Sequence, residues 1–295
     1  MDAVNADAVN AREDTGVAGA GIAEAAHTPG SLILTYFGAY GRERDGGGGR
    51  IAVASLIRLM DAAGAGAPSV RSAVSRLKRR GLLVPEKVAG SAAYALSRDA
   101  AELLADGDRR VYGHPEPEDA WVLVVFSVPE SERHKRHLLR SRLARLGFGT
   151  AAPGVWIAPA HLYEEARHTL DRLGLSPYVD LFRGAHLGFE PTVGAVRRWW
   201  DLDGIARQHR AFLSCAEPLL AAWSRRRDTP PREAFGDYLR VLDSWRRLPY
   251  ADPGLPPRLL PADWPGAEAS RVFTALHTRL REAGADFVRD VHRMA

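Results

Sequence analysis

The feature of this sequence that most limits the possible folds is residues 121–129, WVLVVFSVP, a nearly continuous apolar run. A run of this kind is typical of a strand that is covered on both faces of its sheet. Helices and strands are predicted to alternate after it, at 130–147 (helix), 148–159 (strand, with a possible bend at Pro153–Gly154), 161–174 (helix) and 178–188 (strand). This order predicts a ferredoxin-like domain, which we place at residues 118–190.

The region before this run has a different pattern, which is mainly helical. A buried helix is predicted at 31–40, and an amphipathic helix at 51–63, with Ile51, Leu56, Leu59 and Met60 on its apolar side. The turn GAGA leads into another helix, which has Pro68 in its first turn and Gly81 as its stop.

Two short apolar segments follow within 82–97, separated by small residues at Ala89–Ser91, and they predict a β-hairpin. The order helix, helix, turn, helix, hairpin is that of a winged helix-turn-helix, which we place at residues 30–110. The predicted fold class is therefore α+β with several domains.

The remaining segments complete the predicted organisation. Residues 1–29 are rich in Ala, Gly and small polar residues and predict a disordered tail. Residues 108–120 read as a linker, and 248–266 are too rich in proline to be helical. The pattern from 196 onward is otherwise helical, so we expect a helical C-terminal domain at 195–295.

The helix that begins at Pro68 lies in the stretch PSVRSAVSRLKRRGLL, which holds five basic residues and no acidic one. Its apolar residues share one face at helical spacing: Val70, Ala73, Val74 and Leu77. Ser72, Ser75 and Arg79 fall on the opposite face, where they could meet base edges in a major groove. Four further cations could reach phosphates or bases: Arg71, Arg76, Lys78 and Arg80.

The alternative for this helix is a solvated charged face with no partner. Like charges spaced within a few turns of one helix destabilise it, which counts against that alternative. The helix is also the second of a closely connected pair and precedes a hairpin, which favours DNA binding.

Composition excludes several classes of protein. The chain of 295 residues is 46% hydrophobic and 26% charged, with a formal net charge of +4, so it is expected to be globular. Its single cysteine, Cys215, cannot form an internal disulfide and is expected to be a buried thiol. The sequence has no apolar run of membrane-spanning length and no signal peptide, so we expect a cytoplasmic protein without a membrane partner.

Five stretches of the sequence resemble the PaaX family, the phenylacetic-acid catabolism repressors of bacteria. They are SLILTYFGAYG, SVRSAVSRLKRRGLL, WVLVVFSVPESERHKRHLLRSRLARLGFG, GVWIAP and RRWWDLDGIARQHRAFL. The resemblance implies a winged helix, a central ferredoxin-like domain of the Cas2 type and a helical C-terminal domain. It also implies a homodimer that binds a pseudo-palindromic DNA operator and is released by an aryl-acyl-CoA thioester such as phenylacetyl-CoA.

Carried onto this sequence, the family's recognition helix falls on Ser69–Arg80 and its wing on Val84–Leu96. Family wings often carry basic residues around the tip, whereas this tip reads Ala-Gly-Ser, with Lys87 as the nearby cation. Contact of this wing with a minor groove is therefore in doubt, while the contacts expected of the helix are unaffected.

The Cas2 resemblance raises a metal-dependent nuclease as an alternative, because such enzymes hold a metal with an acidic residue at the end of the first strand. Here Ser127 stands at that position, and the nearest acid, Glu130, lies beyond a proline. His134 and His137 are surrounded by cations, which disfavours a metal site. No nucleophile elbow or phosphate-binding glycine loop occurs, so we predict no catalytic residue, metal or cofactor and no enzyme.

The motif RRWW offers candidates for effector binding. Arg197 and Arg198 could pair with CoA phosphates, while Trp199 or Trp200 could stack on an aromatic acyl group or an adenine. The favoured alternative is that both tryptophans are core anchors and that the two arginines form a solvated flank. A third hypothesis for the whole chain is a ligand-sensing or scaffold protein whose basic helix binds an acidic partner instead of DNA.

Overall fold

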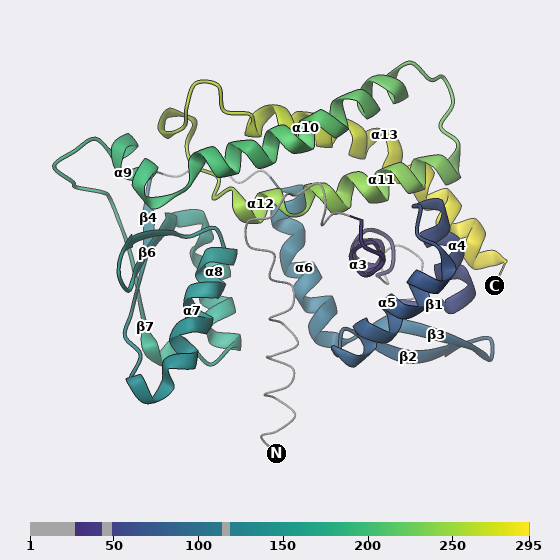
Figure 1. Ribbon diagram of the computed structural model, residues 1–295, viewed down its shortest axis with the longest axis horizontal. Coiled ribbons are helices and arrows are strands. Elements are labelled where there is room, and N and C mark those ends of the chain that lie inside the picture. The colour runs from purple at the N-terminus through teal and green to yellow at the C-terminus, as the bar shows by residue number, and fades with distance from the viewer. Residues whose placement is uncertain (1–26, 43–48, 114–118, 295) are drawn as a thin grey trace. The chain divides into compact units, whose positions relative to one another are not determined.

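The computed structural model describes residues 27–42, 49–113 and 119–294 (Figure 1). Close contacts divide the chain into two compact units. The first unit contains the described residues up to Asp108 together with Ala211–Trp245 and the chain from Glu268 onward. The second contains Arg109–Arg210 and Arg246–Ala267. Helices and strands occur in both, so the predicted α+β class with more than one compact part is confirmed at this level.

The N-terminal part of the first unit contains helices and a small antiparallel sheet with strand order β1-β3-β2. In chain order its elements are α3 (Pro29–Ala39), β1 (Arg50–Ala52), α4 (Val53–Ala62), α5 (Ala67–Arg79), β2 (Leu83–Val88), β3 (Ser91–Leu96) and α6 (Arg98–Tyr112), whose end from Arg109 belongs to the second unit.

Two predictions for this region need correction. Ile51 belongs to β1, where it pairs with Tyr94, so the predicted helix begins only at Val53. The first residues of the predicted linker at 108–120 belong to α6, which continues to Tyr112. Ser97 caps the start of this helix by accepting a hydrogen bond from the backbone N–H of Ala100 at 3.3 Å. Residues 114–118 of that linker and residues 1–26 of the predicted tail lie outside the described residues.

The predicted hairpin is confirmed, and its turn has a defined cause. Strands β2 and β3 pair from Leu83 opposite Leu96 to Val88 opposite Ser91, which leaves two residues in the loop. Both loop residues have positive φ, 48° at Ala89 and 82° at Gly90. This is the geometry of a type I′ turn, whose twist matches that of the strands it joins.

Two helices from the end of the chain complete the first unit, α11 (Pro231–Trp245) and α13 (Gly266–Arg293). Glycines allow both helices to come close to the N-terminal elements. A Cβ at Gly236 would lie 2.2 Å from the carbonyl oxygen of Ala62, and one at Gly284 would lie 2.4 Å from the hydroxyl of Tyr40. Neither site has room for a side chain, so the N-terminal elements share their core with the C-terminal helices.

The second unit is built on a four-stranded antiparallel sheet of order β5-β6-β4-β7. Its main elements are β4 (Trp121–Phe126), α7 (Arg133–Arg145), β5 (Gly149–Ala152), β6 (Val155–Pro159), α8 (Tyr163–Arg172), β7 (Val179–Gly184) and α9 (Thr192–Trp199). The strand predicted at 148–159 is two strands, because Gly154, at φ 77°, turns the chain between β5 and β6. The observed order is therefore strand, helix, strand, strand, helix, strand.

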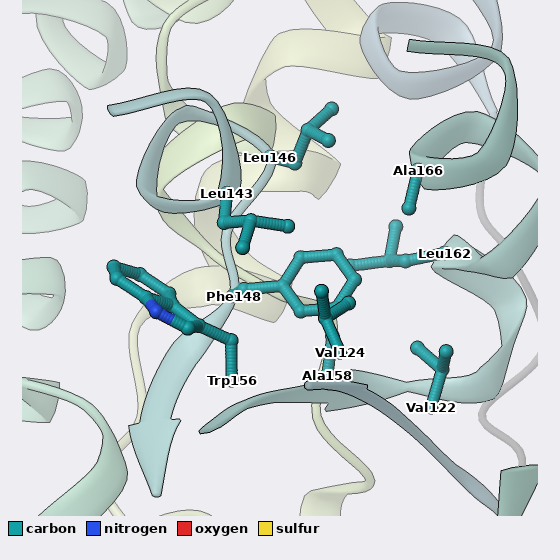
Figure 2. Close-up of a cluster of buried hydrophobic side chains, with 9 residues drawn as sticks. All are labelled: Val122, Val124, Leu143, Leu146, Phe148, Trp156, Ala158, Leu162 and Ala166. Carbon is teal, nitrogen blue, oxygen red and sulfur yellow. The ribbon is translucent and has the colours of Figure 1, made fainter. Parts of the chain in front are cut away.

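Both faces of β4 are covered, as the apolar run predicted. Val122 and Val124 lie in a core with Leu143 of α7 and Ala166 of α8 (Figure 2). Trp121 points to the other face, into a second core that contains Val196 and Trp200. The alternation of side chains along a strand thus places helices on both faces of the sheet.

Helix α10 (Leu202–Ser224) contributes residues to both units. The remaining helical segments are the short α12 (Leu248–Ala251) and 3-10 turns at Glu130–Glu132, Ala160–Leu162, Ser176–Tyr178 and Pro257–Leu259. The helical turn α12 lies within a segment predicted to be a loop.

Cys215 on α10 is exposed, so the predicted burial of this thiol is wrong: α10 buries the neighbouring positions Phe212 and Ala216 instead. Among the helices of the described residues, none has both the length and the apolar character needed to cross a membrane.

Candidate nucleic-acid interface

Helix α5 has the two faces that its sequence predicts. Val70, Ala73, Val74 and Leu77 are buried, and they share the core with α3 and α4. The predicted contact residues within the helix are all exposed: Ser69, Arg71, Ser72, Ser75, Arg76, Lys78 and Arg79. Arg80, the C-cap residue, is half-buried.

The connection between α4 and α5 is short and tightly turned. Gly64 adopts a φ of 91° between the helices, and Gly66 is the N-cap of α5. Proline suits the first turn of α5, because the N–H groups of a first turn have no partner within the helix and proline has no N–H to leave unpaired. Gly81, at φ 67°, ends the segment and leads into β2, as predicted.

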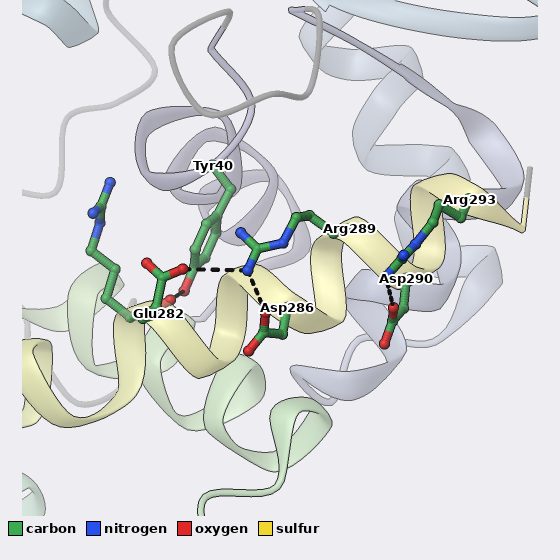
Figure 3. Close-up of polar contacts among 7 residues, drawn as sticks. Tyr40, Glu282, Asp286, Arg289, Asp290 and Arg293 are labelled. Atoms are coloured by element: carbon green, nitrogen blue, oxygen red, sulfur yellow. Dashed lines mark hydrogen bonds and ion pairs between the residues drawn. The ribbon is translucent and has the colours of Figure 1, made fainter.

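The basic side chains of α5 lack acidic partners in the part of the chain that the structure describes. Within the described residues, Arg71, Arg76, Lys78 and Arg79 form no ion pair with any carboxylate. Helix α13 shows the opposite arrangement: Arg289 pairs with Asp286 and with Glu282, the latter at 3.3 Å (Figure 3). The cationic face of α5 is therefore free to meet an external anion.

The hairpin β2–β3 adds little positive charge. Lys87 is exposed on β2 opposite Ala92, but its neighbour Glu86 is exposed as well. The turn itself contains only Ala89 and Gly90. Arg50, exposed on β1 of the same sheet, is a further cation for which sequence reasoning found no role.

The four effector candidates lie at the end of α9 and just beyond it, in the second unit, and they differ in accessibility. Trp200 is buried, and its indole Nε1 donates a hydrogen bond to the carbonyl of Gly147 at 2.8 Å. Trp199 is half-buried, and its ring lies 5.5 Å from that of Trp121. These contacts favour the interpretation of the tryptophans as core anchors.

The two arginines of the motif also differ. Arg198 pairs with Glu190, and this contact lowers the pKa of the Glu190 carboxyl. Arg197 is exposed, and within the described residues it forms no ion pair. Of the four candidates, Arg197 is thus the one whose charge is available to a ligand.

In the structure, too, a serine stands at the position where a nuclease of the Cas2 type would carry its metal-binding carboxylate. Ser127 follows β4 and donates its backbone N–H to the carbonyl of Tyr178 at 3.0 Å. Glu130 lies in the next 3-10 turn, where it pairs with Arg136 at 3.2 Å. The described residues contain no group of three or more His, Cys, Asp or Glu arranged to hold a metal ion.

Comparison with known families matches three consecutive parts of the chain. Residues 28–100 match the model described as PaaX-like protein, 114–196 the PaaX protein central Cas2-like domain, and 200–290 the PaaX-like protein C-terminal domain. The chain belongs to the PaaX family. The predicted resemblance is therefore confirmed.

Two known proteins are similar to this PaaX family member over most of its length. It is 27% identical over 259 residues to the transcriptional repressor PaaX of Escherichia coli (strain K12), covering 84% of this chain and 80% of that protein. The uncharacterized protein Rv0674 from Mycobacterium tuberculosis has a similar structure, with a TM-score of 0.52 and 22% identity. That similarity covers 88% of this chain and 96% of the other, and it supports the fold alone.

Proposed function

We propose that this protein is a cytoplasmic DNA-binding transcriptional repressor whose recognition helix is α5. The observation that carries the proposal is the exposed face of α5, where Arg71, Arg76, Lys78 and Arg79 have no acidic partner among the described residues. The similarity to a transcriptional repressor of Escherichia coli supports it. In this proposal Ser72, Ser75 and Arg79 meet base edges, while the other cations, together with Ser69, Arg80 and Lys87, meet phosphates or bases.

The arrangement of elements supports a winged helix at 30–110, because α3, β1, α4, α5, β2 and β3 follow the order helix, strand, helix, helix, strand, strand. The order of elements and the sheet order β5-β6-β4-β7 support a ferredoxin-like domain at 118–190. We assign that domain to dimerisation or coupling, and residues 195–295 to a helical C-terminal domain. Two copies would place two recognition helices in successive major grooves of a pseudo-palindromic operator.

An aryl-acyl-CoA thioester such as phenylacetyl-CoA is the proposed effector, as the family resemblance implies. Arg197 is its best-placed phosphate contact, whereas Arg198, Trp199 and Trp200 are engaged within the protein. Such a ligand can release the operator only if it binds more tightly to a dimer geometry that does not fit the DNA.

The test is a mobility-shift assay with the promoter regions beside the protein's own gene, random DNA as competitor, and a panel of aryl-acyl-CoA thioesters. A specific shift that one thioester releases supports both the repressor and the effector. A specific shift that no thioester releases rules out the effector class and leaves the repressor.

Two other outcomes of the same assay would reject the repressor. Salt-sensitive binding without sequence preference, or no binding at low salt, would favour the scaffold alternative. Metal-dependent cleavage of the DNA would favour the nuclease.

A further inference from the structure

A second basic helix, α7, lies in the second unit, and the proposed function gives its charges no role. Six of its thirteen residues are Lys or Arg, two are His, and none is acidic. Leu139 and Leu143 anchor one side of the helix in the core. The other side is exposed at Arg133, His134, His137 and Arg140.

Only part of this charge is balanced by acids of the same unit. Lys135 pairs with Glu132 at 2.8 Å, and Arg136 pairs with Glu130 at 3.2 Å, both in the 3-10 turn before the helix. The hydrogen bond from Lys135 lowers the pKa of the Glu132 carboxyl, and one from Tyr178 adds to the effect. Arg133 and Arg140 form no ion pair within the described residues.

Helix stability does not explain these unpaired charges. Arg133 and His134 lie in the first turn, where a cation opposes the helix dipole, and that turn contains no acid. Arg136 and Arg140 are four residues apart, a spacing at which like charges destabilise a helix by a few tenths of a kcal/mol. On α13, by contrast, Arg271, Arg289 and Arg293 each pair with an acid three residues earlier. Three arginines of α13 are thus balanced by acids of their own helix, whereas Arg133 and Arg140 of α7 have no such partner among the described residues.

The chemistry of the α7 face indicates the class of its partner. A guanidinium group can bind a phosphate through two parallel hydrogen bonds. Arg133 and Arg140 are two turns apart, about 10 Å along the helix axis, so they can reach different phosphates of one nucleic-acid backbone. The exposed side of α7 carries no large apolar or aromatic residue, and such residues are the usual anchors of a protein partner.

We propose that the face of α7 formed by Arg133, His134, His137 and Arg140 binds the phosphate backbone of duplex DNA, as a second contact that does not depend on sequence. This proposal rests on the proposed function in one respect, namely that the bound DNA is the duplex that also carries the operator. The α7 face adds affinity for any duplex, whereas α5 selects the sequence.

Fluorescence anisotropy with a labelled 40-bp random duplex tests the proposal on the full-length protein at several salt concentrations. In the variant Arg133→Gln with Arg140→Gln we expect roughly tenfold weaker binding near 0.15 M salt, and a slope of log K against log salt that is smaller by about 2. The matched control, Arg271→Gln with Arg293→Gln, removes the same charge from residues that are already paired, and should change affinity less than twofold.

The variant Arg133→Lys with Arg140→Lys keeps the charge and should retain most of the affinity, which separates electrostatic binding from damage to the fold. Unchanged binding by the glutamine variant overturns the proposal. An equal loss in the α13 control also overturns it, because net charge alone would then explain the effect.

A third variant separates this proposal from the proposed function. Arg76→Gln with Arg79→Gln alters α5, and its preference for the promoter fragment over the random duplex reports on the recognition helix alone. If that preference is unaffected, the assignment of α5 is wrong, whatever α7 does. If the α7 variant loses affinity for the random duplex in the same experiment, the α7 contact still stands.

Discussion

At the scale of the residue, Asp243 on α11 shows how one buried carboxylate connects distant segments. Its side chain is fully buried and accepts hydrogen bonds from the backbone N–H of His27 and the hydroxyl of Thr35, both at 2.8 Å, and from the hydroxyl of Ser31. A buried carboxylate is stable only when such donors compensate for its lost hydration. Asp243 therefore attaches the start of α3 to a helix more than 200 positions away.

Replacing this carboxylate should destabilise the protein strongly. We expect Asp243→Ala to lower the free energy of unfolding by about 2–4 kcal/mol, because three donors lose their acceptor in a buried site. Urea denaturation followed by circular dichroism measures the change. Asp290→Ala, which breaks an exposed pair with Arg293, is the control and should cost less than about 1 kcal/mol. Equal effects of the two changes would contradict this role of Asp243.

Arg79 is the residue on which the proposed readout of DNA depends most. If it contacts a base, Arg79→Ala should weaken binding to the promoter fragment by about 1–3 kcal/mol and relax the sequence preference at one position. Competition mobility shifts with single-base variants of the fragment measure both effects. Unchanged affinity together with unchanged preference would remove Arg79 from the readout.

At the scale of the element, the backbone of the hairpin turn is strained at Ala89, and another residue at that position would relieve the strain. Ala89 adopts a φ of 48°, a left-handed conformation that costs an alanine about 1 kcal/mol. Ala89→Asn creates the Asn-Gly pair that type I′ turns favour, and should stabilise the protein by about 0.5–1 kcal/mol. Gly90→Ala, at φ 82°, should have the opposite effect. Thermal melts compare the two, and a loss of stability in the asparagine variant would exclude this turn type.

Helix α13 should make the first unit sensitive to acid. Burial lowers the pKa of both His277 and His292, and their rings lie at hydrogen-bond distance from the hydroxyls of Tyr238 and Tyr36. In the unfolded chain both histidines take up protons as the pH falls through about 6.5, whereas the folded chain resists protonation. Stability should therefore fall between about pH 7 and pH 5.5.

Urea midpoints at pH 7.5, 6.5 and 5.5 measure this dependence. The variant His277→Gln with His292→Gln keeps a neutral polar side chain at each site and should show a weaker pH dependence. The same dependence in the wild type and the double variant would assign the effect to other groups.

At the scale of the whole molecule, the elements of the proposed winged helix do not form an independent core. The ring of Tyr40, the C-cap residue of α3, packs against those of Phe235 and Tyr238 of α11, with centroid distances of 5.7 and 5.9 Å. Its hydroxyl also donates to the carbonyl of Arg281 on α13 at 3.1 Å. Helix α3 thus packs its aromatic side chains against helices from the end of the chain.

A fragment of residues 27–112 should consequently fail to fold cooperatively. It lacks α11 and α13, and removing them exposes apolar side chains that the small remaining core cannot bury. We expect no sharp thermal transition and at least tenfold weaker DNA binding than the full chain shows. A cooperative melt with full affinity would show instead that the C-terminal helices are dispensable.

Sequence patterns were sufficient for the features that depend on neighbours along the chain. The buried stripe of α5 and the two-sided burial of β4 follow from helical and strand periodicity, and the hairpin turn follows from small residues between apolar segments. The exposure of the cations on α5 was predictable for the same reason, because they lie beside or opposite its apolar stripe.

Other features were decided by contacts between residues far apart in sequence. Ile51 is in a strand because Tyr94 pairs with it, and Trp200 is buried because Trp121 and Gly147 contact it. Nothing local in the sequence showed that α11 and α13 complete the core around α3. Local periodicity reports which side of an element is apolar, but the partner that covers that side is chosen by packing of the whole chain.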